Sequence, residues 1–109
     1  MAVFWLTFRL HEQKTSKGSY EERYDAVVAK LKELSTLTWA NTTSFVVFES
    51  ASSIAALGQA FKGAVDPKVD LFLMRAMERK QAVICGSNDD PDIYDLMVDD
   101  NGTTYLTKI

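Results

Sequence analysis

The feature that most constrains this chain is a short apolar run near its middle, residues 43–50. The run is rich in Val and Phe, which favour strands, and it ends in hydroxyl residues suited to opening a helix. We interpret it as a central strand. A strand, a helix and a strand precede the run, and a helix, a strand and a further strand follow it.

The first strand, residues 2–10, is apolar on both sides. Its residues alternate with the period of two that is typical of a strand. A strand with only one buried face carries polar residues on the opposite face. Because the alternate residues on the second face of this strand are also largely apolar, we expect that something covers this face as well. Residues 69–77 show the same two-faced pattern. The first set is Phe4, Leu6, Phe8 and Leu10, and the second is Val3, Trp5, Thr7 and Arg9.

Two helices are predicted between the strands. Ser19 and Glu22 fit a capping box, and the helix that follows has an apolar stripe at spacings of three and four. Arg23, like the other charged residues of this helix, is placed mostly off the stripe. The serines at 50–53 offer N-caps for the second helix, which ends before Pro67 because proline disfavours helical geometry in the preceding residue.

Shorter segments complete the order of elements. Residues 36–39 form a hairpin with the central strand, and residues 81–85 form a fifth strand antiparallel to the one before it. Near the C-terminus, residues 91–98 fit a short helix that begins with proline. The alternative is a hairpin that turns at residues 100–102 and returns through residues 103–107.

This order predicts an α+β, ferredoxin-like βαββαβ fold. We expect an antiparallel sheet with strand order 4-1-3-2, two helices on one face, an extra fifth strand and a short C-terminal helix or hairpin. Residues 1–86 form the predicted domain. Residues 87–109 form an acidic C-terminal extension, packed on the same domain or on its dimer mate.

The open face of such a sheet predicts how the chain associates. A monomer would expose Trp5 together with the second faces of the neighbouring strands, a larger apolar patch than soluble monomers usually show. A homodimer that buries this patch on both copies resolves the exposure, with an interface formed by Val3, Trp5, Thr7 and Arg9. The alternative is that the C-terminal tail folds over the open face.

Charge and composition set limits on the partners. The net charge is −3, with eleven Lys and Arg against nine Asp and Glu in residues 1–86, and one Lys against six Asp in residues 87–109. Nucleic-acid binders usually carry a basic excess, so a nucleic-acid partner stays open without support from the charge. No run approaches the ~20 apolar residues of a membrane span, and the N-terminus has no features of a secretory signal. We expect a cytoplasmic protein with no membrane partner.

One passage resembles a known family. The order of elements, the Asp-Pro-Lys-Val-Asp-Leu-Phe-Leu passage at residues 66–73 and the extra strand at 81–85 look like the small dimeric nucleases of CRISPR adaptation and the related virulence-associated protein D toxins. The resemblance spans residues 2–86 and implies a dimer. In that family an aspartate near the end of strand one helps to bind a divalent metal at the dimer axis. Here residues 6–11 contain no carboxylate, and Arg9 is a cation where a metal ligand is expected, so this departure argues against metal-dependent cleavage by the usual route and leaves binding as the other use of such a fold.

Arg9 and His11 are the candidate catalytic residues, because they lie at the end of a central strand. The Arg9 guanidinium could hold a phosphate or a carboxylate, and His11 could act as an acid or a base near neutral pH. In the alternative interpretation Arg9 pairs with an acid such as Glu49, and His11 is a solvated loop residue. Asp66 and Asp70 could supply oxygen ligands to a hard cation, but helix termination and turn formation also explain them, and we favour that interpretation.

No motif implies a metal or a cofactor. The acidic residues between 89 and 100 do not follow the alternating pattern of an EF-hand loop. Cys85, the single cysteine, lies in an apolar run and is interpreted as a buried structural thiol. No complete catalytic set is visible, so the sequence does not decide whether the protein is an enzyme.

Three hypotheses about function follow. The first is a homodimeric binding or regulatory module, motivated by the apolar second face. The second is a metal-dependent nuclease-like protein, motivated by the resemblance. The third is a small-molecule enzyme of the dimeric α+β barrel type, in which paired sheets enclose an apolar pocket with Arg9 or His11 at its mouth.

Overall fold

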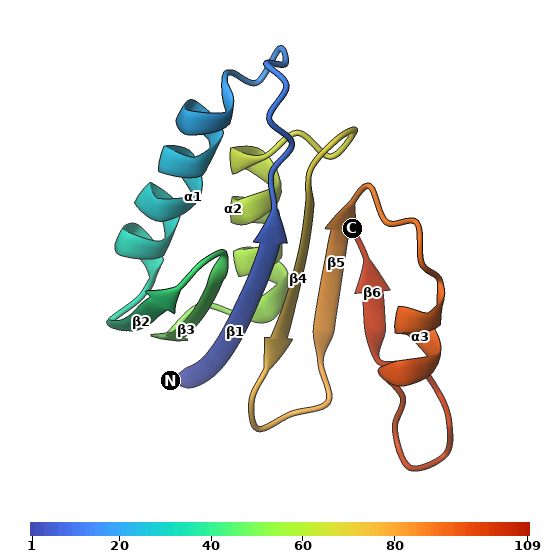
Figure 1. Ribbon diagram of the computed structural model, residues 1–109. Helices are drawn as coiled ribbons and strands as arrows, with labels where there is room; N and C mark the ends of the chain where they lie inside the picture. Colours follow the sequence, from blue (N-terminus) through green and yellow to red (C-terminus); the bar gives the residue numbers. More distant parts are fainter.

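The computed structural model describes the whole chain, residues 1–109, as an α+β fold with three helices and one six-stranded sheet (Figure 1). The predicted α+β class is confirmed. No helix has both the length and the apolar character needed to cross a membrane. The strands are β1 (Ala2–Arg9), β2 (Leu37–Thr42), β3 (Phe45–Ser50), β4 (Leu71–Ala76), β5 (Ala82–Gly86) and β6 (Leu106–Lys108), and the helices are α1 (Tyr20–Leu34), α2 (Ile54–Ala64) and α3 (Asp92–Leu96).

The strands lie side by side in the order β2-β3-β1-β4-β5-β6. All neighbours are antiparallel except β5 and β6, which are parallel, so the sheet is mixed. The sequence predicts five antiparallel strands, and this count was wrong by one. The chain after α3 returns alongside β5, where the backbone N–H of Ile109 donates to the Ile84 carbonyl at 3.0 Å and extends the sheet.

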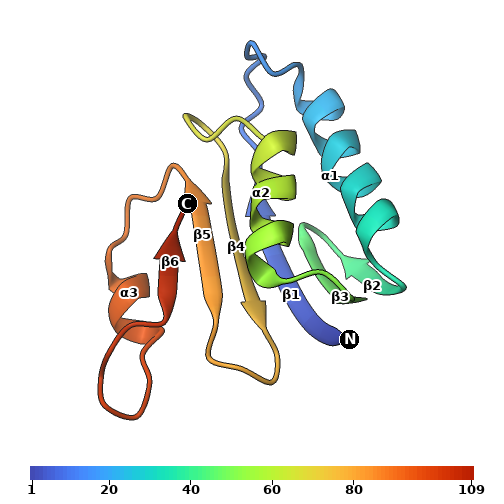
Figure 2. The same ribbon diagram turned by 180° about the vertical axis from the view of Figure 1, so that it is seen from behind.

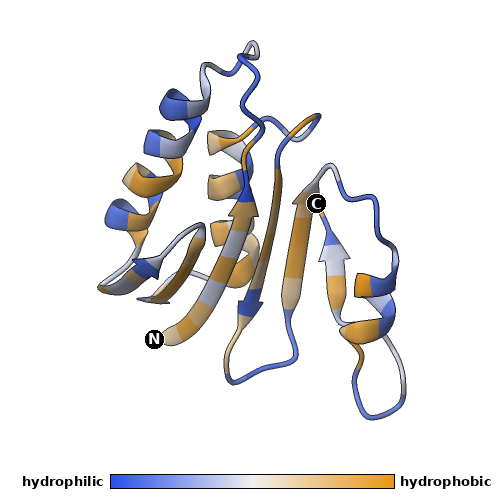
Figure 3. Cartoon of the chain, viewed as in Figure 1, coloured by the Kyte–Doolittle hydropathy of each residue, from blue (hydrophilic) through white to orange (hydrophobic).

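Helices α1 and α2 cover one face of the sheet (Figure 2). One alternate set of β1 residues, Phe4, Leu6 and Phe8, points into the core beneath these helices and is almost fully buried. Figure 3 shows hydrophobic colour along the central strands and on parts of all three helices, while most of the connecting loops are hydrophilic. Burial of these side chains against the two helices is the main source of stability.

Serine side chains cap the starts of both predicted helices and contact the end of α1. The capping box of α1 is confirmed: the Ser19 N–H donates to the Glu22 carboxylate at 3.0 Å, and the Glu22 N–H donates to the Ser19 hydroxyl at 3.1 Å. For α2, Ser53 is the N-cap. The Ser50 hydroxyl instead donates to the Leu34 carbonyl at 2.6 Å, and so connects the end of β3 to the end of α1.

The placement of Arg23 off the buried stripe was wrong. Its side chain is fully buried, on the same face of α1 as Val27 and Leu31. The spacing of four residues between these positions places them one above another on the helix. A charged residue at the start of this series therefore enters the protein interior, where it needs a charged partner.

Within the C-terminal extension, β6 forms the edge of the sheet and α3 lies on the face opposite α1 and α2. The predicted helix there is confirmed but shorter, as α3, and an isolated bridge between Val98 and Thr104 closes the turn that follows it. A second, smaller core joins this extension to the sheet. Its buried members are Ala82, Ile84, Met97 and Leu106, and the partly buried side chains packed against it include Trp5, Leu71, Leu73 and Ile93.

Candidate functional site

The candidate site is the face of the sheet opposite α1 and α2, which we call the open face. In β1 it carries Val3, Trp5 and Thr7, which are half-buried, and Arg9, which is exposed. These are the alternate residues that the sequence assigns to an interface. The extension covers the β4–β5 side of this face and leaves the β2–β3 side bare. The alternative that the tail folds over the face therefore describes part of it.

An aromatic row crosses the bare side. The Trp39 and Phe45 rings are 6.5 Å apart in an edge contact, and the Phe45 and Trp5 rings are 6.1 Å apart. Trp39 remains 48% exposed and its neighbour on the same face, Leu37, is 71% exposed. All six residues of β2 are exposed, and none of them is charged. Leu37 and Trp39 adjoin the other rings of the row, and a contiguous exposed apolar patch is typical of an interaction surface.

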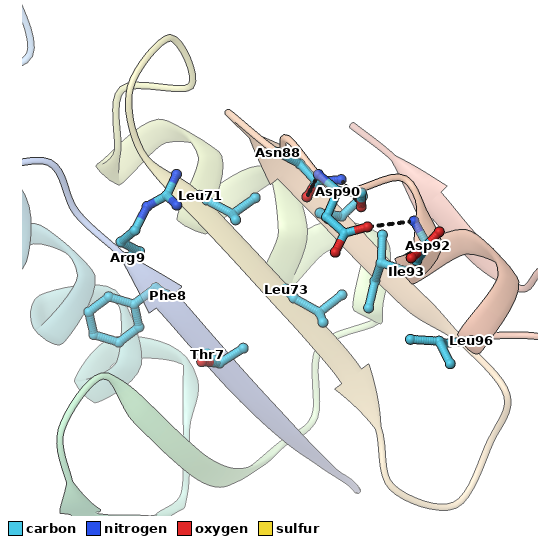
Figure 4. A pocket seen from close by; sticks show the side chains of 11 residues that line it. Thr7, Phe8, Arg9, Leu71, Leu73, Asn88, Asp90, Asp92, Ile93 and Leu96 are labelled. Atoms are coloured by element: carbon cyan, nitrogen blue, oxygen red, sulfur yellow. Dashed lines mark hydrogen bonds between the residues drawn. The ribbon is translucent and has the colours of Figure 1, made fainter.

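A groove of about 310 Å³ runs between α3 and the central strands (Figure 4). Leu71 and Leu73 of β4 form its floor, and Ile93 and Leu96 of α3 form one wall. Arg9 stands at the end of the groove nearest to the tip of β1. The carboxylates of Asp90 and Asp92 line the α3 side, where the Asp92 N–H donates to Asp90 Oδ1 at 3.0 Å. The groove thus combines an apolar floor with a cation and two carboxylates at separate positions.

Arg9 does not pair with Glu49, so that interpretation was wrong. Glu49 lies opposite Val3 at the other end of β1, and its carboxylate accepts from the Thr36 hydroxyl at 2.9 Å. Arg9 Nη2 donates to the Ser87 carbonyl at 3.0 Å, and its guanidinium makes no ion pair. Arg9 lines the groove, and its other guanidinium N–H groups have no partner within the protein, so an anionic group could bind there.

His11 is not brought to the groove. It lies beyond β1 in the exposed loop, and its ring Nδ1 accepts from the Gln13 N–H at 3.0 Å. Its backbone N–H donates to Asp70 Oδ1 at 2.9 Å. The structure therefore separates the two candidate residues: Arg9 lines the open face, and His11 has the solvated loop position of the alternative interpretation.

Sequence reasoning missed a buried network centred on Arg23 and Asp70, both fully inaccessible. Arg23 Nε donates to Asp70 Oδ2 at 2.9 Å and Nη2 donates to Oδ1 at 3.3 Å. The other N–H groups of Arg23 bond to the carbonyls of His11, Gln13 and Gly18. All five guanidinium donors are thus used, and the loop at residues 11–18 is held against α1. The spacing of Arg23 with buried helix positions is the signal that could have found it.

The aspartates considered as cation ligands have structural partners. Asp70 accepts from Arg23, from His11 and, at 2.8 Å, from the Asp66 N–H. Asp66 accepts from the Lys68 N–H, and this bond together with the Thr15 hydroxyl lowers the pKa of the Asp66 carboxyl. Both groups close the turn between α2 and β4, as the turn interpretation predicts.

The remaining reactive side chains are dispersed. Among the C-terminal carboxylates, Asp100 pairs with Lys80 at 2.8 Å, and this cation lowers the pKa of Asp100. Cys85 is buried in the main core, where desolvation raises the pKa of its thiol. No group of three or more His, Cys, Asp or Glu side chains is arranged to hold a metal ion.

Comparisons with known proteins give no family: no family model matches the chain, and no curated protein or solved structure is significantly similar to it.

Proposed function

We propose that this protein is a homodimeric binding module that uses its open face to join two copies. The observation that carries the proposal is the exposure of Leu37 and Trp39 beside the aromatic row, on a face that the extension only half covers. Pairing two such faces removes apolar surface from water on both copies at once, which is the dominant favourable term in association. A two-fold axis makes this burial equal for the two copies.

We further propose a ferredoxin-like core for residues 2–76. Support comes from the chain order β1-α1-β2-β3-α2-β4 and from the neighbour order β2-β3-β1-β4, with α1 and α2 together on one face. In this interpretation β5, α3 and β6 are additions at one edge. They leave the other side of the open face free for association.

The solution mass tests the homodimer. We expect wild-type protein to be a dimer by light scattering at micromolar concentration, and Trp39→Glu to be a folded monomer, because a carboxylate would be desolvated in the interface. Tyr20→Glu is the matched control: Tyr20 is 38% exposed but lies on α1, away from the open face, so this variant should remain a dimer. A wild-type monomer would refute the proposal.

The groove supports a second candidate function, the binding of a small anionic apolar molecule. Its volume lies within the usual range of ligand sites, and its apolar floor ends at a guanidinium without an ion-pair partner. Anilinonaphthalene sulfonate is a suitable probe, because it has an apolar body and one anionic group. We expect its fluorescence to rise with wild-type protein and to rise several-fold less with Arg9→Ala. Equal binding by both proteins would remove this candidate.

A further inference from the structure

The open face has a raised side and a bare side. Helix α3 lies over the β4–β5 side, where Ile93 and Leu96 stand above the sheet (Figure 4). Over β2 and β3 no element lies, and the aromatic row is the surface. A helix adds a layer about 10 Å thick, which is also the usual distance between packed sheets. Two copies therefore cannot pack with their sheets in direct contact over the whole open face. The side that carries α3 in each copy must lie over an uncovered part of the other copy.

We propose that the two copies pair about a two-fold axis parallel to the strands, so that α3 of each copy fills the hollow over β2 and β3 of the other. This inference rests on the proposed homodimer and specifies its geometry. Rotation about such an axis exchanges the two sides of the face, and it places each raised side against a bare one. Leu96, which is 76% exposed, then lies over the β2–β3 side of the other copy, where Trp39 is the nearest exposed apolar side chain.

The positions along the strands agree with this pairing, because rotation about a parallel axis keeps each residue at its own level. Leu96 lines the groove beside Leu73, which pairs with Thr7. Trp39 pairs with Val47, which in turn pairs with Trp5. The two levels differ by two residues of β1, roughly 7 Å. The length of the Trp and Leu side chains reduces this offset, and a two-fold axis slightly inclined to the strands closes the remainder.

The charges also complement one another under this rotation. Arg9 lies on β1, one of the two middle strands of the sheet, and Asp90 and Asp92 lie at the same end of the groove on the raised side. The rotation carries Arg9 of each copy across the midline toward these carboxylates in the other copy. Opposite charges then approach at both symmetric positions.

The alternative axis, perpendicular to the strands, is disfavoured by shape. Rotation about that axis keeps the raised side on the same side of the pair, so α3 would meet α3 of the other copy. Two layers would then occupy one side while both aromatic rows remained uncovered. The exposed Leu37 and Trp39 would gain no partner.

Engineered cysteines report the geometry directly. Trp39→Cys and Leu96→Cys are made as separate proteins, each checked by light scattering, and treated with a short bismaleimide crosslinker alone and as a mixture. Cys85 is retained, because it is fully buried and closed to the reagent. Residue 39 on β2 and residue 96 over β5 are separated by four strand spacings, about 19 Å, within one copy, so a crosslink between them joins two copies.

We expect a crosslinked dimer in the mixture and none with either variant alone. A crosslink in Leu96→Cys alone would place α3 against α3 and overturn the proposed axis. A dimeric mixture without any crosslink would overturn the contact between α3 and β2 while leaving the homodimer intact. Wild-type protein that is monomeric by light scattering would overturn both the geometry and the proposed function.

Discussion

Replacement of Asp70 by asparagine tests whether the buried Arg23 network holds the fold together. In the wild type the Asp70 carboxylate accepts four hydrogen bonds, from the backbone N–H groups of His11 and Asp66 and from two nitrogens of Arg23. An asparagine has one acceptor oxygen, so its NH₂ group would face donors at the other position. The Arg23 charge would also remain buried without a counter-ion.

The expected cost is large for an isosteric change. Removing one partner of a buried ion pair destabilises a protein by about 3–5 kcal/mol, since the remaining charge is left uncompensated. For a domain of this size each kcal/mol shifts the melting temperature by about 4–8 °C, so Asp70→Asn should lower it by at least about 12 °C. The exposed pair of Lys30 and Glu33, 3.4 Å apart, supplies the control, because Glu33→Gln should change the free energy of unfolding by no more than about 0.5 kcal/mol.

Replacing both charges with apolar residues should not restore stability here. Arg23 also bonds to three backbone carbonyls, and Asp70 accepts from two backbone N–H groups. Arg23→Met combined with Asp70→Leu would leave these five groups without their partners, and a buried unpaired polar group costs about 1–3 kcal/mol.

Urea unfolding followed by circular dichroism measures all four proteins, and an unchanged m-value would show that the unfolded states are comparable. If Asp70→Asn costs less than about 1 kcal/mol, or if the double variant is as stable as the wild type, then the network is not the structural element that we infer.

Three further predictions concern local features. Asp66 and Glu22 have lowered pKa values in the folded protein, so their contribution to stability is present above about pH 4 and is lost as the pH falls through the folded-state pKa values. The melting temperature should therefore decrease when the pH is lowered from about 4. The decrease should be smaller in Asp66→Asn, which lacks one of the two carboxyl groups. Gly86 has φ +111°, and an added Cβ would lie 1.9 Å from the Asp70 carbonyl oxygen, so Gly86→Ala should fail to fold stably. Gly63 in α2 has open space around it, so Gly63→Ala should raise the free energy of unfolding by about 0.5–1 kcal/mol in urea titrations. Ser19→Ala removes the helix cap and should cost about 1 kcal/mol by the same assay; an unchanged midpoint would contradict the capping role.

The features that local sequence specifies were predicted well. Alternation in β1 identified which residues face α1 and α2 and which face away, because successive side chains of any strand point to opposite sides. The capping box at Ser19 located the start of α1, since both bonds lie within four residues. The open-face position of Arg9 follows from the same alternation.

Other features depend on partners far along the chain. The pairing of Arg9 with Glu49 was wrong, because register places them at opposite ends of β1. The groove exists only because the extension folds back along the open face, which brings residues 88–96 beside residues 7–9. The alternative hairpin places an extended segment at residues 103–107, which overlaps β6, but the parallel pairing of β6 with β5 depends on how the chain folds back after α3.

By itself, then, the sequence determined the local elements and the two-sided apolar character of the central strands, because both arise from contacts and periodicities within a few residues. Only the tertiary structure decided what lies on each side. Burial turned Arg23 from a helix-surface charge into the partner of Asp70, 47 positions away, since a charge in the interior must be neutralised wherever the fold brings a counter-ion. The same long-range packing placed α3 over half of the open face and left Trp39 and Leu37 exposed on the other half.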